Sequence, residues 1–189
     1  MRLLRAATHK RMPWKNGGGE TVEIAVFPED AGLGDFDWRI SMATVASNGP
    51  FSLFEGVDRT LTILSGAGMA LAIDGAPAVH LDPSSEPLTF PADVPVAARL
   101  ADGPITDLNV MTRRGRFTHR VVRLEGGEVQ ILSLAGRHNV LLACDGGVSV
   151  VVDGCQIKLE MQDALLLDDE TSLGLLGTGK TILIIVDSA

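Results

Sequence analysis

The 189-residue chain contains no tyrosine, and its two tryptophans and six phenylalanines bring the aromatic content to only 4%. A core for this chain must therefore be built mainly from aliphatic side chains. The chain also has only two cysteines, Cys144 and Cys155, which excludes the disulfide-dense framework of small secreted domains. We expect both thiols to be free and buried, although their spacing also allows a disulfide across one hairpin.

Long hydrophobic runs are missing as well. The longest, residues 182–186, is far shorter than the ~20 apolar residues that cross a bilayer. Residues 1–12 lack the apolar segment of a signal peptide.

Basic residues are also scarce, since 16 Lys and Arg against 24 Asp and Glu give a formal net charge of −8. This charge disfavours nucleic acid and anionic membranes as partners, so we expect a cytoplasmic protein that binds neither.

Helical periodicity is nearly absent too. In its place, short runs rich in Val, Ile and Leu alternate with clusters of Gly, Pro, Asp and Asn. Many short strands at regular spacing are typical of all-β sandwiches and barrels. The expected strands are residues 2–6, 21–27, 37–45, 59–64, 69–73, 78–81, 94–100, 105–111, 120–124, 128–134, 140–143, 148–152, 156–159, 164–167, 172–176 and 181–186.

An internal repeat runs through the chain. Asp74-Gly75 and Asp153-Gly154 lie 79 residues apart, and each pair suits a hairpin turn with positive φ. Further on, residues 105–110 match residues 182–187 at an offset of 77. A double-stranded β-helix, or jelly roll, is the natural module of this size. We therefore predict two tandem jelly-roll modules.

The boundary between the modules is expected in the Arg-rich linker, which gives modules at residues 1–115 and 116–189. Polar residues of the first module align with less polar or aliphatic residues of the second: Arg59 with His138, Asp107 with Ile184, and Asn109 with Val186. An aliphatic interior is a filled core, whereas inward polar groups indicate a wet or liganded cavity. We therefore expect the site in the first module, and a structural or dimerising role for the second.

The scarce aromatics gather in residues 36–66, which hold one tryptophan and three phenylalanines. Alternation along the first strand of this stretch places Trp38 on one face and Arg39 and Ser41 on the other. Aromatic side chains near these residues and near Arg59 indicate an apolar pocket with a few fixed polar groups. A hydrophobic hairpin with surface arginines is the alternative interpretation.

Residues 14–21 read WKNGGGET, and three consecutive glycines carry a large entropic cost on folding. Their exposed amides could bind an anion, with Lys15 adding charge. A flexible loop that leads into the next strand is the alternative.

Asp107, Asn109 and Met111 share one face of their predicted strand. Asp107 could orient Arg39 or Arg59 and so leave a guanidinium group for a ligand carboxylate. A structural buried salt bridge would explain the same residues.

Other familiar sites are absent or misleading. Residues 174–181, GLLGTGKT, match the phosphate-binding pattern G-x-x-x-x-G-K-[ST]. A strand-like ILIIVDSA follows them, however, instead of the helix that would supply amides to a phosphate, so we predict a hairpin turn. The four histidines are too dispersed to suggest a metal site, and no serine has an obvious histidine partner. We therefore expect no metal, no cofactor and no catalytic residue.

Four motifs, WKNGGGET, FDWRIS, GPFSLFEGVDR and DLNVMTRR, follow one another between residues 14 and 114. In this order and spacing they resemble the HutD/Ves family over residues 1 to about 115, while the second half matches in strand pattern. The resemblance implies a bicupin in a bacterial cytoplasmic protein linked to histidine utilisation or, in the Ves branch, to stress response. It also implies ligand-binding residues: Lys15, Asn16, Trp38, Arg39, Ser41, Phe51, Arg59, Asn109 and Met111.

The residues and the resemblance together predict a metal-free protein that binds a small carboxylate metabolite, similar to urocanate or formylglutamate, and modulates histidine utilisation. We expect binding rather than catalysis. One alternative is a metal-independent enzyme that acts on a histidine-pathway intermediate, with Lys15 or Asp107 as its acid–base group. Another is a protein-interaction module of stress response. The sequence leaves open whether the chain forms a homodimer.

Overall fold

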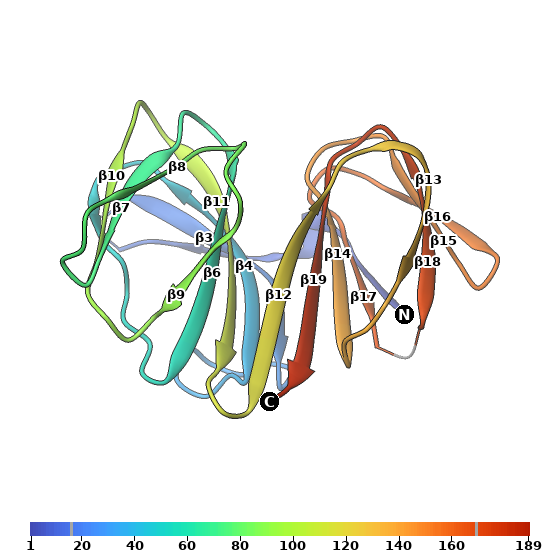
Figure 1. The fold of residues 1–189 in the computed structure, drawn as a ribbon, viewed down its shortest axis with the longest axis horizontal. Coiled ribbons are helices and arrows are strands. Elements are labelled where there is room, and N and C mark those ends of the chain that lie inside the picture. The colour runs from blue at the N-terminus through green and yellow to red at the C-terminus, as the bar shows by residue number, and fades with distance from the viewer. Residues whose placement is uncertain (16, 169) are drawn as a thin grey trace. The chain divides into compact units, whose positions relative to one another are not determined.

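The computed structural model describes residues 1–15, 17–168 and 170–189. Their secondary structure consists of strands β1 to β19 and one short 3-10 helix, η1, so the prediction of an all-β fold is confirmed. The chain forms two compact units (Figure 1). The N-terminal unit comprises Lys10–Phe117 with Ala189, and the C-terminal unit comprises Met1–His9 with Thr118–Ser188.

Residues 1–9 lie outside the module in which the sequence places them. The expected division is 1–115 and 116–189, but β1 (Arg2–Leu4) pairs antiparallel with β17 (Ala164–Leu167). Leu3 packs against the apolar core of the C-terminal unit, which is why the start of the chain belongs there.

The N-terminal unit consists of two antiparallel sheets. The larger has the strand order β2-β3-β4-β11-β6-β9, and the smaller has the order β5-β10-β7-β8 (Figure 1). An apolar core with residues from both sheets, such as Leu61 and Leu71, lies between them. The strands are β2 (Lys10–Pro13), β3 (Gly19–Phe27), β4 (Trp38–Val45), β5 (Gly49–Pro50), β6 (Val57–Ser65), β7 (Met69–Ile73), β8 (Val79–Leu81), β9 (Leu88–Pro91), β10 (Val96–Leu100) and β11 (Ile105–Arg113).

The C-terminal unit has the same construction. Its sheets have the orders β1-β17-β14-β19-β12 and β13-β18-β15-β16. The core between them is aliphatic. In addition to β1 and β17, its elements are η1 (Ala6–Thr8), β12 (Phe117–Leu124), β13 (Gly127–Ser133), β14 (His138–Ala143), β15 (Val148–Val152), β16 (Cys155–Leu159), β18 (Ser172–Gly177) and β19 (Thr181–Ser188).

The sheet orders agree with the internal repeat. The run β4-β11-β6-β9 corresponds to β12-β19-β14-β17, and β10-β7-β8 corresponds to β18-β15-β16. Asp74 and Asp153 both have a φ of 49°, and the glycine after each also has positive φ. The two Asp-Gly pairs are therefore turns, as predicted, although only Asp153-Gly154 forms a two-residue hairpin between paired strands.

The residue-by-residue alignment of the two modules is wrong by one position in β14 and β19. Leu183 and Ile185 of β19 belong to the interior core, so the neighbouring residues Ile184 and Val186 face the other side of the sheet. In β14 the interior core includes Leu141 and Ala143, which places Asn139, rather than His138, on the inward face. A one-residue slip reverses the faces of a strand, and matching letters does not reveal it.

The sequence does not predict three short strands, β2, β5 and β9. Each ends at a proline, namely Pro13, Pro50 and Pro91, and proline weakens a strand prediction because it cannot donate to a sheet. All three strands lie at the edge of a sheet, which is where proline is tolerated.

Other features of the chain agree only in part with expectation. The GLLGTGKT segment covers the end of β18 and its connection to β19. These two strands lie in different sheets, so the segment connects strands but is not the predicted hairpin turn. Cys144 and Cys155 are both free, but Cys144 is only half-buried and Cys155 is exposed. Burial raises the pKa of the Cys144 thiol to about 11.

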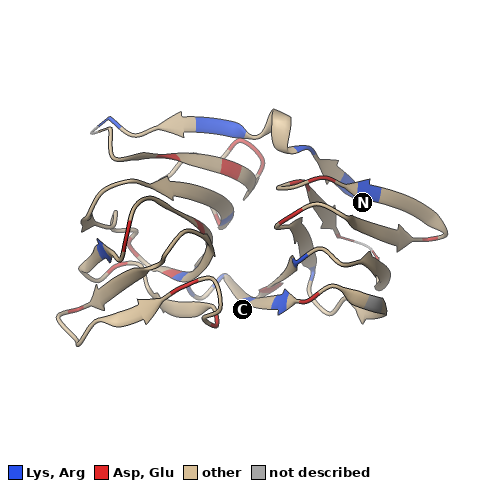
Figure 2. Ribbon diagram, turned by 90° about the horizontal axis from the view of Figure 1, so that it is seen from above, with Lys and Arg blue, Asp and Glu red and all other residues tan. Residues whose placement is uncertain are grey.

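Charged residues of both signs are distributed over each unit (Figure 2). Among the helices of the described residues, none is long and apolar enough to cross a bilayer.

Candidate functional site

A cavity of about 620 Å³ lies in the N-terminal unit. Strands β4, β6 and β11 contribute its floor, and the segments at residues 12–15 and 50–54 contribute much of its wall. Ala43 and Val45 belong both to the apolar core and to the lining of the cavity. The cavity therefore continues the space between the two sheets at the end where polar side chains replace the apolar ones.

Most of the predicted ligand-binding residues line this cavity: Lys15, Arg39, Ser41, Phe51, Arg59, Asn109 and Met111. Asn16 lies outside the described residues. Trp38 does not line the cavity, because it lies on the face of β4 opposite to Arg39. It is 2% exposed and stacks on Phe27, with ring centroids 5.8 Å apart. Trp38 is therefore a core residue.

Arg39 is held within a polar network of the floor. Its Nε donates to Glu23 Oε2 at 2.7 Å, and its Nη1 donates to Ser41 Oγ at 3.3 Å. Arg39 is only 4% exposed, so this ion pair is shielded from water. The positive charge of Arg39 is thus already balanced by a carboxylate of the protein.

Arg59 is placed differently, since it lies between two aromatic rings. Its guanidinium carbon is 5.3 Å from the ring centroids of both Phe51 and Phe54, within the range of cation–π attraction. Its Nη2 donates to Met111 Sδ at 3.5 Å, which is a weak acceptor. Among the described residues, the buried Nε of Arg59 has no hydrogen-bond partner.

The pKa of Arg59 reflects this environment. Burial, opposed in part by the charge of Asp107 and assisted by that of Arg39, lowers the pKa of Arg59 to about 10. Arg59 is 5% exposed. A buried cation with a free donor is costly to an empty protein and useful to one that binds an anion.

Asp107 is the one acidic side chain that lines the cavity within the described part of the chain. It is 1% exposed, and burial raises its pKa to about 7, against the opposing effects of Asn109, Arg59 and the backbone amide of Ala43. Asn109 Nδ2 donates to Asp107 Oδ1 at 2.6 Å. No partner for Asp107 Oδ2 exists among the described residues. The expected ion pair of Asp107 with Arg39 or Arg59 is therefore not formed; Glu23 pairs with Arg39 instead.

The described residues of the glycine-rich segment are hydrogen-bonded and packed rather than loose. Trp14 N donates to Gly19 O at 2.9 Å, and Gly17 N donates to Trp14 O at 3.0 Å. The indole Nε1 of Trp14 donates to Thr21 Oγ1 at 2.8 Å. A Cβ atom at Gly19 would collide with the carbonyl oxygen of Thr44. Close packing of backbone against β4 therefore requires glycine here, and it positions Trp14 in the cavity wall.

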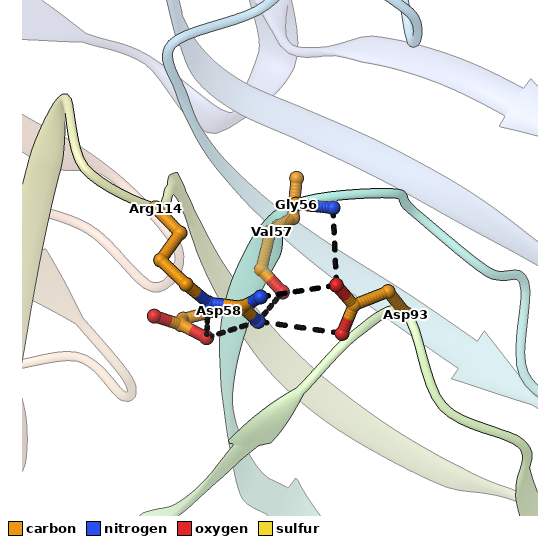
Figure 3. Close-up of polar contacts among 5 residues, drawn as sticks. All are labelled: Gly56, Val57, Asp58, Asp93 and Arg114. Carbon is orange, nitrogen blue, oxygen red and sulfur yellow. Dashed lines mark hydrogen bonds and ion pairs between the residues drawn. The ribbon is translucent and has the colours of Figure 1, made fainter.

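The segment that carries Phe51 and Phe54 is fixed by a cluster of charges around Arg114 (Figure 3). Arg114 Nη2 donates to Asp58 Oδ1 at 2.7 Å, and its Nη1 donates to Asp93 Oδ2 at 3.1 Å. Asp93 Oδ2 also accepts from the backbone N of Gly56 at 3.2 Å. These contacts tie Gly56, at the end of the aromatic segment, to Asp93 after β9, and link Asp93 through Arg114 to Asp58 of β6.

Sequence reasoning does not identify Trp14, Glu23 and Phe54 as part of the site. Glu23 lies opposite Ser41 in the pairing of β3 with β4, which makes it a diagonal neighbour of Arg39. Phe51 and Phe54 are three residues apart in a connecting segment. The two-residue alternation of a strand therefore does not predict that they lie on the same side.

Two units of paired antiparallel sheets around an apolar interior define a protein of the cupin-like class. A cupin 2 conserved barrel domain protein from Leptotrichia buccalis shares this fold, with a TM-score of 0.58 at 13% identity and coverage of 88% of both chains. Within this class the chain belongs to the HutD family, whose family model matches residues 6–185.

Three relatives illustrate this membership. An uncharacterized 21.2 kDa protein in the hutC 3′ region of Pseudomonas putida is 36% identical over 97% of this chain and 96% of its own length. Protein Ves of Citrobacter koseri is 38% identical over 85% of this chain and 78% of its own. The structure of HutD from Pseudomonas fluorescens SBW25, in a formate condition, has a TM-score of 0.85 at 34% identity and covers 100% of this chain and 98% of that one.

Proposed function

We propose that the cavity of the N-terminal unit binds a small carboxylate metabolite, similar to urocanate or formylglutamate, and that binding modulates histidine utilisation. The observation that carries the proposal is the state of Arg59. This arginine is buried, lines the cavity, and has an Nε–H for which no described residue is a hydrogen-bond acceptor. A carboxylate is the group that matches a guanidinium donor best.

The shape of the site supports the same ligand class. Phe51 and Phe54 flank Arg59, and with Trp14 they offer flat apolar surface to the rest of a small molecule. Lys15 is exposed in the cavity wall and adds a positive charge that would attract an anion. The metabolic link rests on the family: the Pseudomonas putida relative takes its name from the hutC 3′ region.

The test is a calorimetric titration of urocanate and of N-formylglutamate into the wild-type protein and into Arg59→Lys. Lysine keeps the charge but loses the planar fork, so affinity is expected to fall by roughly tenfold to a hundredfold, as loss of one charge-assisted hydrogen bond predicts. Arg99→Lys is the matched control, because Arg99 is exposed on β10 of the same unit. Failure of every carboxylate to bind the wild-type protein below millimolar concentration would refute the proposal.

A second function, metal-independent catalysis, is favoured by one feature. Asp107 lines the cavity and has a buried, unpartnered oxygen and a pKa of about 7, which suits a general acid or base. Incubation of the protein with histidine-pathway intermediates, followed by mass spectrometry, distinguishes the two functions. A product that forms with the wild-type protein but not with Asp107→Asn would establish an enzyme.

A further inference from the structure

The two carboxylate oxygens of Asp107 have different roles. Oδ1 accepts a hydrogen bond of 2.6 Å from Asn109 Nδ2, and a proton on this oxygen would weaken that contact, because a hydroxyl oxygen is a poorer acceptor than a carboxylate oxygen. Oδ2 is buried, and no described residue donates to it or accepts from it. A protonated Asp107 therefore carries its proton on Oδ2, and the residue itself lines the cavity.

The charges around Asp107 are nearly balanced before any ligand enters. Arg39 on β4 is paired with Glu23 of β3 at 2.7 Å, and Arg59 on β6 forms no ion pair within the described residues. The smaller sheet and the segment at residues 50–54 add no titratable lining residue, and Lys15 is exposed. A ligand carboxylate would thus bring a second negative charge to a floor that has one unpaired cation.

We propose, on the basis of the function proposed above, that a carboxylate enters this cavity together with one proton from solvent, which Asp107 takes up on Oδ2. The neutral acid then donates its Oδ2–H to the ligand, while Arg59 pairs with the ligand charge. No other bond forms or breaks. Asp107 is thereby a specificity residue. An anionic ligand binds together with a proton on Asp107, whereas a ligand that offers an N–H group can bind the ionised form of Asp107 without proton uptake.

The linkage acts near neutral pH. In the free protein, burial holds the pKa of Asp107 at about 7, and a bound anion raises it further, because like charges disfavour each other's ionised form. Anion affinity is therefore greatest below pH 7 and falls as the pH rises above it. The affinity can fall by at most about tenfold per pH unit, which corresponds to the uptake of one proton on binding.

Two probes test this coupling, N-formylglutamate and formate. Their carboxyl groups stay ionised between pH 6 and pH 8.5, so any proton uptake on binding belongs to the protein. Each probe is titrated calorimetrically in phosphate and in Tris buffer, since the difference in heat gives the number of protons taken up. We expect uptake to rise from about half a proton at pH 7 toward one proton at pH 8, with weaker binding at the higher pH.

Asp107→Asn imitates the protonated acid, because its amide can donate where Oδ2–H would. This variant is expected to bind both probes with an affinity that does not change between pH 6 and pH 8, and without proton uptake. Asp74→Asn is the matched control and should behave as wild type. Asp74 is exposed in a turn of the same unit, and its φ of 49° tolerates asparagine.

The outcomes separate this inference from the proposed function. Probes that bind the wild-type protein equally well at pH 6 and pH 8, without proton uptake, leave the binding function intact and overturn the coupling. Loss of binding in Asp107→Asn at every pH, in a variant that still melts cooperatively, would show that the ligand needs an ionised Asp107, and this also overturns the inference. Failure of both probes to bind refutes both proposals.

Discussion

Replacing Arg59 by methionine is expected to make the free protein more stable and to abolish carboxylate binding. Burial holds the pKa of Arg59 at about 10, against about 12.5 for a free arginine side chain. One pK unit corresponds to ~1.4 kcal/mol, so keeping the charged form inside the fold costs about 3 kcal/mol. The two cation–π contacts with Phe51 and Phe54 return ~0.5–1 kcal/mol each. Methionine fills a similar space without the charge, which leaves a net gain of ~1–2 kcal/mol.

The sign of this effect can be checked against pH. The folded pKa lies below the unfolded one, so the unfolded state binds the proton more tightly, and the cost is fully present at every pH below about 10. Urea denaturation at pH 7 therefore measures all of it. The control is Arg99→Met on the exposed face of β10, where the change should stay within ~0.5 kcal/mol.

If Arg59→Met lowers the free energy of unfolding by more than ~1 kcal/mol relative to Arg99→Met, then Arg59 is a structural residue whose contacts outweigh its burial. The reasoning that connects its free Nε to a ligand would then lose its basis. A ligand-binding residue should cost stability and supply affinity, and only the combination of a stabler protein with lost binding satisfies that expectation.

Three further predictions follow from the same unit. The pKa of Asp107 is about 7 in the folded protein and ~3.9 in the unfolded chain. The folded state therefore binds more protons between these values, and the free energy of unfolding falls as pH rises through them. Asp107→Asn should lack this fall, and its free energy of unfolding, measured by urea denaturation at pH 8, should exceed that of the wild type by up to about 4 kcal/mol. Gly19→Ala, which pushes a methyl group against Thr44 O, should lower the free energy of unfolding by ~1–3 kcal/mol, whereas an unchanged melting curve would show that β3 shifts freely. Arg114→Gln frees the segment that carries the aromatic rings and should weaken N-formylglutamate binding several-fold in calorimetry; unchanged affinity would show that the rings are held without it.

Strand alternation predicts the floor of the cavity well. A period of two along β4 separates Arg39 and Ser41 from Trp38, and the structure has the same two faces. Trp38 enters the predicted site through family resemblance alone, against the alternation of its own strand. The local pattern was the better guide here, because the face on which a side chain lies depends only on the strand that contains it.

Contacts between strands are less accessible to sequence reasoning. The partner of Arg39 is Glu23, which depends on the register between β3 and β4, and that pairing shifts between Glu23 and Ala25. No local pattern reveals such an irregularity. The same limit explains β1, whose pairing with β17 joins residues at opposite ends of the chain.

The C-terminal unit shows how the fold pairs a polar side chain at the equivalent position of its sheet. Strand β14 takes the place in its sheet that β6 has in the other, and its inward face also carries a polar residue, Asn139. The Asn139 side chain is satisfied by the protein itself, since its Nδ2 donates to the carbonyl oxygen of Gly136 at 2.8 Å. Around it the core is aliphatic.

Arg59 in the N-terminal unit has no such backbone partner for its Nε within the described residues. A polar group inside a sheet sandwich is normally paired, because an unpaired one costs free energy. The fold can meet this requirement, as Asn139 demonstrates. The N-terminal unit keeps two buried groups unpaired, Arg59 Nε and Asp107 Oδ2, on one cavity. Unpaired polar groups of opposite charge on a shared cavity are best explained by a partner that comes from outside the chain.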